Sequence, residues 1–194
     1  MNITNIRIYP TDGTTPRKAS VGIVIDNAIA FHGLKIVEGK DGKLFVAMPS
    51  RKNPETNRYD NIYFHPVSAQ VREELEQKVL EAWEKVKANP ETTSFDMGDP
   101  SGKMELSSIR IRDGYEGTLA TVSAILDGEM VLQRLRIREA RESGATVVSM
   151  PARKGSDGSY MDVYHPVTSE ARQIITDEIL AAYTKWQNEK AAEE

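Results

Sequence analysis

The chain has 194 residues, a formal net charge of −4, three histidines and no cysteine. The lack of cysteine excludes disulfide scaffolds, thiolate zinc sites and thiol nucleophiles, and it fits a reducing compartment. No apolar run is long enough to cross a membrane, and the N-terminal residues do not form a charged and apolar leader. We therefore predict a cytoplasmic protein without membrane insertion.

Charge is unevenly distributed along the chain. Residues 1–88 hold 13 basic and 11 acidic side chains, residues 89–102 hold three acidic ones, and residues 103–194 hold 12 basic and 15 acidic ones. The net charges of these segments are +2, −3 and −3. This balance argues against indiscriminate binding of polyanions, so basic character must be local.

The first segment predicts an antiparallel meander. Asp26-Asn27 and Asp41-Gly42 are turn signals, and residues 44–48 are apolar enough for a central strand. Residues 50–64 are polar and rich in turn residues, with a short extended piece at 62–64. Apolar side chains alternate with polar or small ones in residues 6–8, 19–25 and 28–37. This alternation is typical of a strand with one buried face.

An amphipathic helix follows His65-Pro66. Pro66 disfavours helical dihedrals at His65, and Ser68 has the side chain of an N-cap. The apolar residues after Ser68 recur at helical spacing and form one stripe that we expect to pack on the sheet. This stripe consists of Val71, Leu75, Val79, Ala82, Trp83 and Val86.

The same programme then recurs. The segment LFVAMPSRK at residues 44–52, followed by His65-Pro66, returns as VVSMPARK at 147–154, followed by His165-Pro166. Asp127-Gly128 takes the place of the Asp26-Asn27 turn. Thr168 takes the place of the Ser68 cap, and the second helical stripe consists of Ala171, Ile175, Ile179, Leu180, Tyr183 and Trp186.

This repeat predicts an α+β fold of two similar units, each an antiparallel β-meander of four to five strands followed by a C-terminal amphipathic helix. Units of this size bury only a modest core, so we expect them to pack together as a pseudo-twofold dimer. The predicted boundaries are 1–87 for the first unit, 88–103 for the linker, 104–188 for the second unit and 189–194 for a charged tail.

A basic pair follows each apolar strand at the Met-Pro step. Arg51-Lys52 and Arg153-Lys154 offer a planar fork and a point charge for phosphate, and a nearby helix N-terminus offers free N–H groups. Arg72 and Arg172, in the first turns of the helices, extend this candidate patch. The alternative is a solvated loop without function, which is the usual role of surface charge.

Neither catalysis nor metal binding is predicted. His65 and His165 precede proline, where an imidazole bonds backbone groups more often than it catalyses a reaction. We find no Ser-His-Asp order, no paired carboxylates and no glycine-rich phosphate loop, so we predict no enzyme activity, no cofactor and no metal site. Trp83, Tyr183 and Trp186 lie on the helical stripes, which favours a core role over base stacking.

Taken together, these motifs resemble the stage V sporulation protein G (SpoVG) family. The resemblance rests on residues 32–39 (HGLKIVEG), 44–52 (LFVAMPSRK) and 162–167 (DVYHPV), and it covers nearly all of both units. It implies a small meander with a C-terminal helix, usually a homodimer, and site-specific binding of DNA, also of RNA, by regulators of septation, sporulation or virulence. Members ordinarily carry one copy, so a tandem chain resembles a dimer made covalent.

The second unit departs from this pattern. Gln133 replaces His32, and an aspartate three residues before the histidine is present only as Asp162, because the first unit has Asp60 two residues further away. The first unit is also net basic. These differences predict that the two units bind unequally and that Arg51 and Lys52 matter more than their counterparts.

Two function classes remain open. The first is a regulator whose basic loops bind DNA and/or RNA across the pseudo-twofold axis. The second is a protein-interaction module of the division or sporulation machinery, with exposed sheet edges or helix faces as the contact surface. The acidic balance favours the second class, whereas the repeated basic pair and the family resemblance favour the first. Further self-association of the fused pair is left open.

Overall fold

The computed structural model describes residues 1–115, 117–155 and 158–193. In the first unit, β1 (Ile3–Pro10), β2 (Arg17–Ile25), β3 (Ile29–Glu38) and β4 (Leu44–Ala47) form an antiparallel meander. Helix α1 (Ala69–Ala88) packs on β1 and β4. The second unit repeats this order with β9 (Leu106–Asp113), β10 (Ala120–Leu126), β11 (Met130–Glu139), β12 (Thr146–Ser149) and α2 (Ser169–Glu193). The predicted α+β fold is confirmed.

The predicted turns and caps are also confirmed. Asp26 and Asn27 have φ of 51° and 50°, and Asp127 and Gly128 have φ of 51° and 70°, as the tight hairpins of twisted strands require. The side chain of Ser68 accepts a hydrogen bond from Val71 N at 3.2 Å, and Thr168 accepts one from Ala171 N at 3.1 Å. Both caps satisfy N–H groups that have no partner within the helix.

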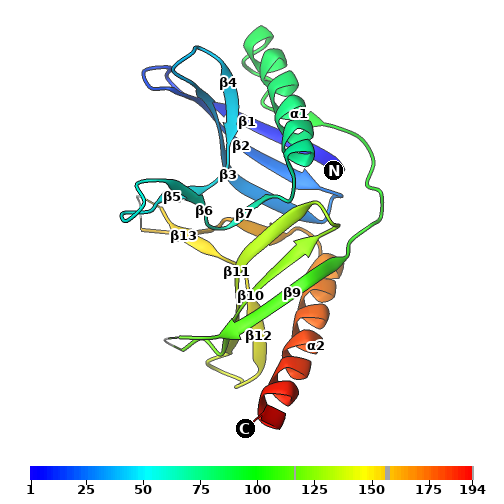
Figure 1. The fold of residues 1–194 in the computed structure, drawn as a ribbon. Coiled ribbons are helices and arrows are strands. Elements are labelled where there is room, and N and C mark those ends of the chain that lie inside the picture. The colour runs from blue at the N-terminus through cyan, green and yellow to red at the C-terminus, as the bar shows by residue number, and fades with distance from the viewer. Residues whose placement is uncertain (116, 156–157, 194) are drawn as a thin grey trace.

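The two units exchange short strands. Strand β7 (Phe64–Pro66) leaves the first unit and pairs with β11, while β15 (Tyr164–Pro166) leaves the second unit and pairs with β3. Long β3 and β11 therefore each carry two partners on one edge, one from their own unit and one from the other. Figure 1 shows the result, two sheets meeting at a waist where the exchanged strands cross. The exchange explains why the units form one body.

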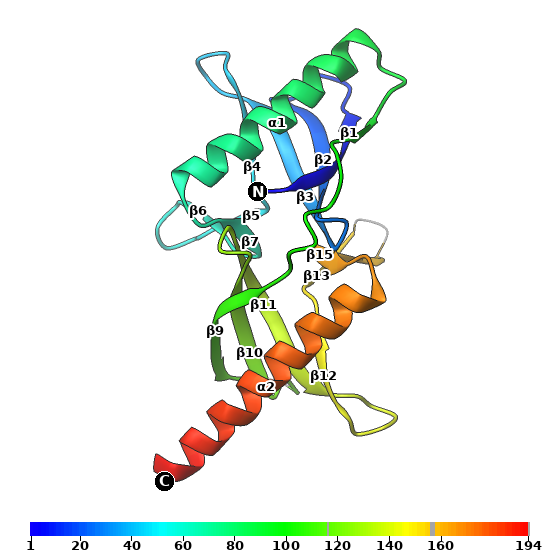
Figure 2. The same cartoon turned by 90° about the vertical axis from the view of Figure 1, so that its right-hand side faces the viewer.

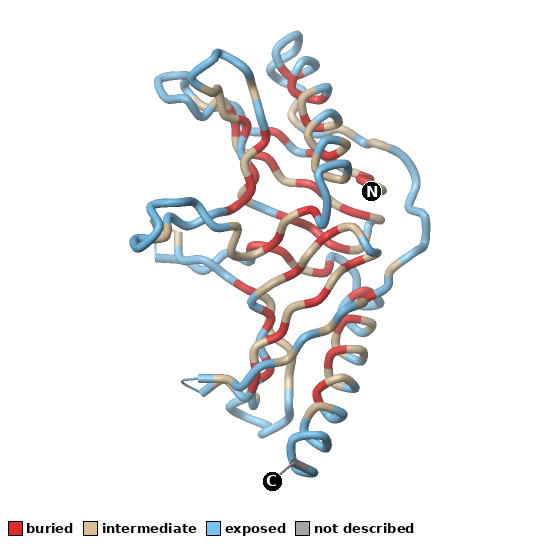
Figure 3. The backbone as a smooth tube through the Cα atoms, viewed as in Figure 1, coloured by how far each residue is buried: buried red, intermediate tan, exposed pale blue. Residues whose placement is uncertain are grey.

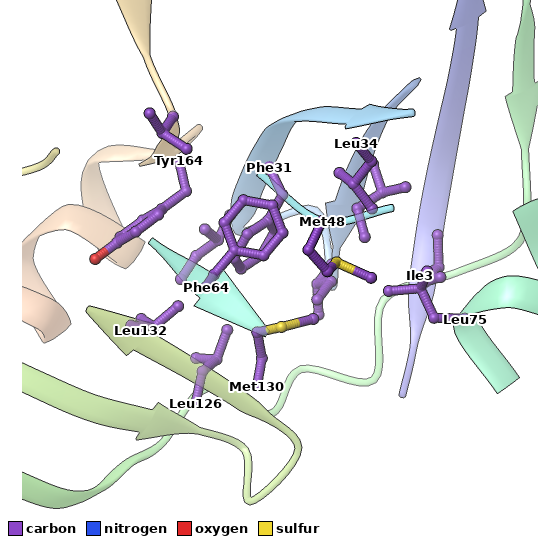
Figure 4. Packing of buried hydrophobic residues seen from close by; sticks show 14 of the residues in the cluster. Ile3, Phe31, Leu34, Met48, Phe64, Leu75, Leu126, Met130, Leu132 and Tyr164 are labelled. Carbon is purple, nitrogen blue, oxygen red and sulfur yellow. The ribbon is translucent and has the colours of Figure 1, made fainter. Parts of the chain in front are cut away.

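Aromatic side chains fill the core at this waist. The ring centroids of Phe31 and Phe64 lie 4.9 Å apart at 66°, and Tyr164 lies 5.8 Å from Phe31 and 6.3 Å from Phe64. Phe31 comes from β3, whereas Phe64 and Tyr164 come from the exchanged strands, so both units contribute (Figure 4). The buried Tyr164 hydroxyl donates to the Gln133 carbonyl at 2.8 Å. One continuous core joins the units.

Both helices cover the same side of the molecule. Figure 2 shows α1 and α2 together in front of the sheets, and Figure 3 shows that the buried positions of each helix face its sheet. Trp83 and Tyr183 are buried and Trp186 is half-buried against the core, as the helical stripes predicted. The opposite face of each sheet carries no helix and is called the open face below.

Two segments differ from the sequence expectation. The linker includes β8 (Ser94–Asp96), which pairs with the free edge of β1. Backbone hydrogen bonds flank this pairing, from Ile8 N to the Thr93 carbonyl and from Met97 N to the Thr4 carbonyl. Helix α2 continues to Glu193 and so takes up most of the tail expected at 189–194. An ion pair of 2.6 Å between Lys190 and Asp113 holds this last part of the helix to β9.

Candidate nucleic-acid interface

Each basic pair lies on a short hairpin. Arg51 and Lys52 belong to β5 (Ser50–Lys52), which pairs with β6 (Tyr59–Asn61), and Arg153 and Lys154 belong to β13 (Ala152–Lys154), which pairs with β14 (Tyr160–Asp162). All four side chains are exposed, and none forms an ion pair within the described part of the chain. Both hairpins project from the waist on the side away from the helices (Figure 1).

The cross-strand neighbours of the two arginines differ. Arg51 lies opposite Asp60 in the hairpin register, whereas Arg153 lies opposite Met161. A carboxylate directly across a strand pair offsets the charge of its neighbour, although Asp60 itself accepts a hydrogen bond from Asn53 at 3.2 Å. The second hairpin therefore presents the less neutralised arginine.

Arg153 also reaches across to the first unit. A Cβ built on Gly33 of β3 would lie 3.4 Å from a terminal guanidinium nitrogen of Arg153 and 3.5 Å from the Pro49 ring. Gly33 has φ of +85°, which a side chain adopts only with strain. The pairing of β2 with β3 shifts register next to this glycine, as in a β-bulge. Glycine allows β3 to bend there and allows the Arg153 guanidinium to lie close to the backbone of β3. The second unit's hairpin completes the open face of the first unit's sheet.

The open faces themselves are basic, although the motifs in the sequence did not predict it. On the first sheet this face carries Arg7 and Lys35, which line one groove with His32 and Arg153. On the second sheet it carries Arg110, Arg112, Arg134, Arg136 and Arg138, all exposed. A signal was present in the sequence, since arginine alternates with isoleucine or leucine in β9 and β11, and period-2 alternation places all these arginines on one face.

Arg72 and Arg172 do not join the hairpins. They lie in the first turns of α1 and α2, where their backbone N–H groups donate to Ser68 and Thr168 carbonyls at 3.1 Å. These helices cover the side of the sheets opposite to the hairpins (Figure 2). The structure therefore brings together Arg153, Arg7 and Lys35, leaves Arg51, Lys52 and Lys154 on projecting hairpins, and separates Arg72 and Arg172 from them.

Two histidines stack where β15 joins β3. The rings of His32 and His165 lie 5.2 Å apart at 18°, and the buried Nδ1 of His165 has no hydrogen-bond partner among the described residues. His65, the counterpart of His165, contacts the Pro66 carbonyl through Nδ1 at 3.0 Å. The predicted bond to backbone is therefore present at His65, whereas the Nδ1 of His165 does not make one within the described residues. Gln133 stands where the second unit would need a stacking partner for it.

Desolvation by this packing lowers the pKa of His32 below its usual 6.5, and His165, Arg153 and Arg7 lower it further, while Asp162 opposes them. Although His32 as a residue is exposed, its ring resists protonation. Between pH 6.5 and the lower pKa of the folded state, the unfolded chain binds this proton more readily than the folded chain does. Unfolding therefore becomes more favourable as the pH falls through 6.5 towards the folded pKa.

We expect His32→Gln to reduce this loss of stability on acidification. Glutamine stands at the equivalent position, Gln133, and does not titrate. We compare the free energy of unfolding of the parent with that of the variant at two pH values, one well above and one well below 6.5. The parent should lose more stability than the variant on going to the lower pH. Denaturant unfolding at both pH values measures this difference, and parallel losses in the two proteins would show that His32 is not responsible.

Among the described residues, no three His, Asp or Glu side chains come together in an arrangement able to hold a metal ion. Neither described helix is long and apolar enough to span a membrane.

Comparison with known proteins gives the family. The SpoVG family profile matches residues 1–85 and again residues 104–185. Relatives named "Putative septation protein SpoVG" include one from Clostridium perfringens strain SM101, 40% identical over 87 residues, which are 45% of this chain and 93% of the relative. One from Caldanaerobacter subterraneus subsp. tengcongensis is 39% identical over 89 residues, 46% of this chain and 94% of the relative.

A relative of the same name from Clostridium acetobutylicum is 39% identical over 92 residues, 47% of this chain and 94% of that protein. Each relative is therefore matched along nearly its full length by about half of this chain. The two profile matches coincide with the two meander-and-helix units. The chain belongs to the SpoVG family and carries the family's domain twice in one polypeptide.

Proposed function

We propose that this protein is a nucleic-acid-binding regulator related to septation or sporulation, and that the β5–β6 and β13–β14 hairpins contact phosphates. The observation that carries the proposal is the placement of both basic pairs. All four side chains are exposed and form no ion pair within the described residues, and the two hairpins that carry them lie on the same side of the molecule (Figure 1). A surface of this kind matches the regular negative charge of a nucleic acid backbone.

The names of the relatives support the biological setting. They are called putative septation proteins, and the family match covers both units of this chain. We infer a cytoplasmic regulator that acts on DNA and/or RNA without a cofactor and without catalysis. The exchange of β7 and β15 fixes the two hairpins relative to each other, so they act as one binding surface rather than as two separate arms.

The alternative is a protein-interaction module of the division machinery. Tyr59, Tyr160 and Met161 on the hairpins are exposed large apolar side chains that suit a protein partner as well as a base. The basic neighbours of these residues favour the nucleic acid. Because of the exposed apolar side chains, we keep division or sporulation proteins as alternative partners of the same surface.

A titration over salt concentration tests the proposal. Binding of the full chain to duplex DNA, single-stranded DNA and RNA should weaken linearly in log–log form with rising salt, with a slope of about −0.9 per duplex phosphate contacted. Fluorescence anisotropy of labelled oligonucleotides measures it. Absence of binding to all three polymers at low salt would replace the proposal by the protein-interaction alternative.

A further inference from the structure

The open face of the second sheet differs from that of the first. We call Arg110, Arg112, Arg134, Arg136 and Arg138 the arginine platform. Strand β10 pairs Thr121 with Arg112 on one side and with Arg136 on the other, so one row runs arginine, hydroxyl, arginine across three strands. The same row of the first sheet contains Tyr9, Ser20 and Lys35.

These arginines carry charge that the described residues leave uncompensated. Within residues 1–115, 117–155 and 158–193, no platform arginine forms an ion pair. The described side chains lining the groove over this face include four arginines and three serine or threonine residues, and no carboxylate. Arginines two positions apart along a strand are separated by about 6.8 Å, comparable with successive phosphates of an extended strand.

Aromatic rings are interleaved with this charge. The Arg134 guanidinium lies 5.6 Å from the Tyr63 ring centroid, and that of Arg136 lies 6.0 Å from the Tyr115 centroid. Tyr63 comes from the chain entering the exchanged strand β7, and its carbonyl accepts a hydrogen bond from Gln133 N at 2.7 Å. Tyr115 is 55% exposed, so its ring is available for stacking.

Arg134 occupies a backbone conformation that favours glycine. Its φ is 63°, and the equivalent position in the first unit is Gly33 with φ of 85°. In the first unit, the guanidinium near this bulge is supplied by Arg153 of the other unit. In the second unit, Arg134 itself supplies it, at the expense of backbone strain that a glycine would avoid. A strained arginine held on an open face is a candidate binding residue.

We propose that the arginine platform binds single-stranded nucleic acid laid across the open face of the second sheet. This inference rests on the proposed function and adds a second surface to it. Guanidinium planes beside tyrosine rings suit unstacked bases and their phosphates together, which a duplex does not offer. An acidic peptide would use the charge but not the rings. RNA and DNA single strands share this chemistry.

The test uses the full chain and two matched triple variants. The platform variant combines Arg110→Gln, Arg134→Gly and Arg136→Gln. The control combines Lys40→Gln, Lys43→Gln and Lys103→Gln, which removes three exposed charges that line neither groove over the open faces. Labelled uridine and thymidine strands of about 12 nucleotides and a duplex are titrated by anisotropy. Arg134→Gly alone is tested as well, because the glycine fits the backbone there.

We expect the platform variant to bind both single strands at least tenfold more weakly than the parent. Its single-strand salt slope should be smaller by about 2, since each of three lost contacts accounts for about 0.7. Duplex binding through the hairpins and all binding by the control should be preserved. Arg134→Gly should weaken single-strand binding while its melting temperature is equal to or above that of the parent, which separates binding from folding.

Several outcomes would overturn the inference. If the platform variant binds single strands as the parent does, or if the parent binds duplex but no single strand, the inference fails while the proposed function stands. If the parent binds no nucleic acid, both fail. If polyglutamate of equal length displaces the strand as effectively as an unlabelled strand, the surface is a general anion binder and not a nucleic-acid platform. Loss confined to RNA would also count against the inference, because contacts of guanidinium groups and rings with phosphates and bases should weaken for both strands alike.

Discussion

Phe64→Ala is expected to destabilise both units at once, by about 3–5 kcal/mol. Phe64 is fully buried, and its ring packs against Phe31 and Tyr164 in the core that joins the units. Truncation leaves a cavity at the point where the exchanged strands meet, and close-packed surroundings collapse only partly into it. The loss therefore falls on the pairing of β7 with β11 as well as on the first unit.

Each helix carries one of the chain's two tryptophans, so each unit has its own fluorescence probe. Trp83→Phe leaves Trp186 to report on α2, and Trp186→Phe leaves Trp83 to report on α1. Phe64→Ala is introduced into each of these single-tryptophan proteins, and denaturant unfolding is followed by fluorescence. The two unfolding transitions should coincide, and each should be shifted by the same amount from that of its single-tryptophan parent. A shift seen by Trp83 alone would mean that the units unfold independently and that the shared core does not couple them.

Removing the four hairpin charges is expected to give the largest effect on binding. Arg51, Lys52, Arg153 and Lys154 are exposed, and the two hairpins that carry them lie on one side of the molecule (Figure 1). If all four contact phosphates, replacing them by alanine lowers the duplex salt slope by about 3–4, because each contact accounts for about 0.9. Exposed charges contribute little to folding, so the free energy of unfolding should change by less than about 1 kcal/mol.

Anisotropy titrations at several salt concentrations measure the slope, and thermal unfolding of the same variant serves as the control for folding. A folded quadruple variant with the parent's affinity and slope would rule out the hairpins as the duplex site. Splitting the variant into its two pairs tests their balance. Net charge favoured Arg51 and Lys52, whereas the neighbours of Arg153 favour the second pair, since Met161 rather than a carboxylate lies across from it.

Local chemistry made much of the fold predictable. The turn at Asp26-Asn27 and the cap at Ser68 depend on interactions within a few residues, so the sequence pattern contains their cause. The exchange of β7 and β15 does not depend on interactions of this local kind. Each segment is three residues long and has no periodicity, and its partner lies in the other unit, so only the packed structure determines the pairing.

Only part of the candidate site was predictable from the sequence, for a similar reason. The basic pairs stand out as adjacent letters, but the arginine platform is spread over β9 and β11 and becomes one surface only when the strands pair through β10. Net charge concealed it further. The second unit is net acidic, yet several of its carboxylates lie on α2, on the other side of the sheet from the arginines: Glu170, Asp177, Glu178 and Glu189.

Mapping the bound surface on the intact chain tests both proposed surfaces at once, and a chain of 21.7 kDa suits NMR. Backbone amide signals are followed while a short duplex, and separately a single strand, is added. We predict that the duplex shifts signals of β5, β6, β13 and β14, that the single strand shifts signals of β9, β10 and β11, and that signals from the exposed sides of α1 and α2 stay unchanged. Shifts confined to the helices, or none at all with either polymer, would contradict this prediction.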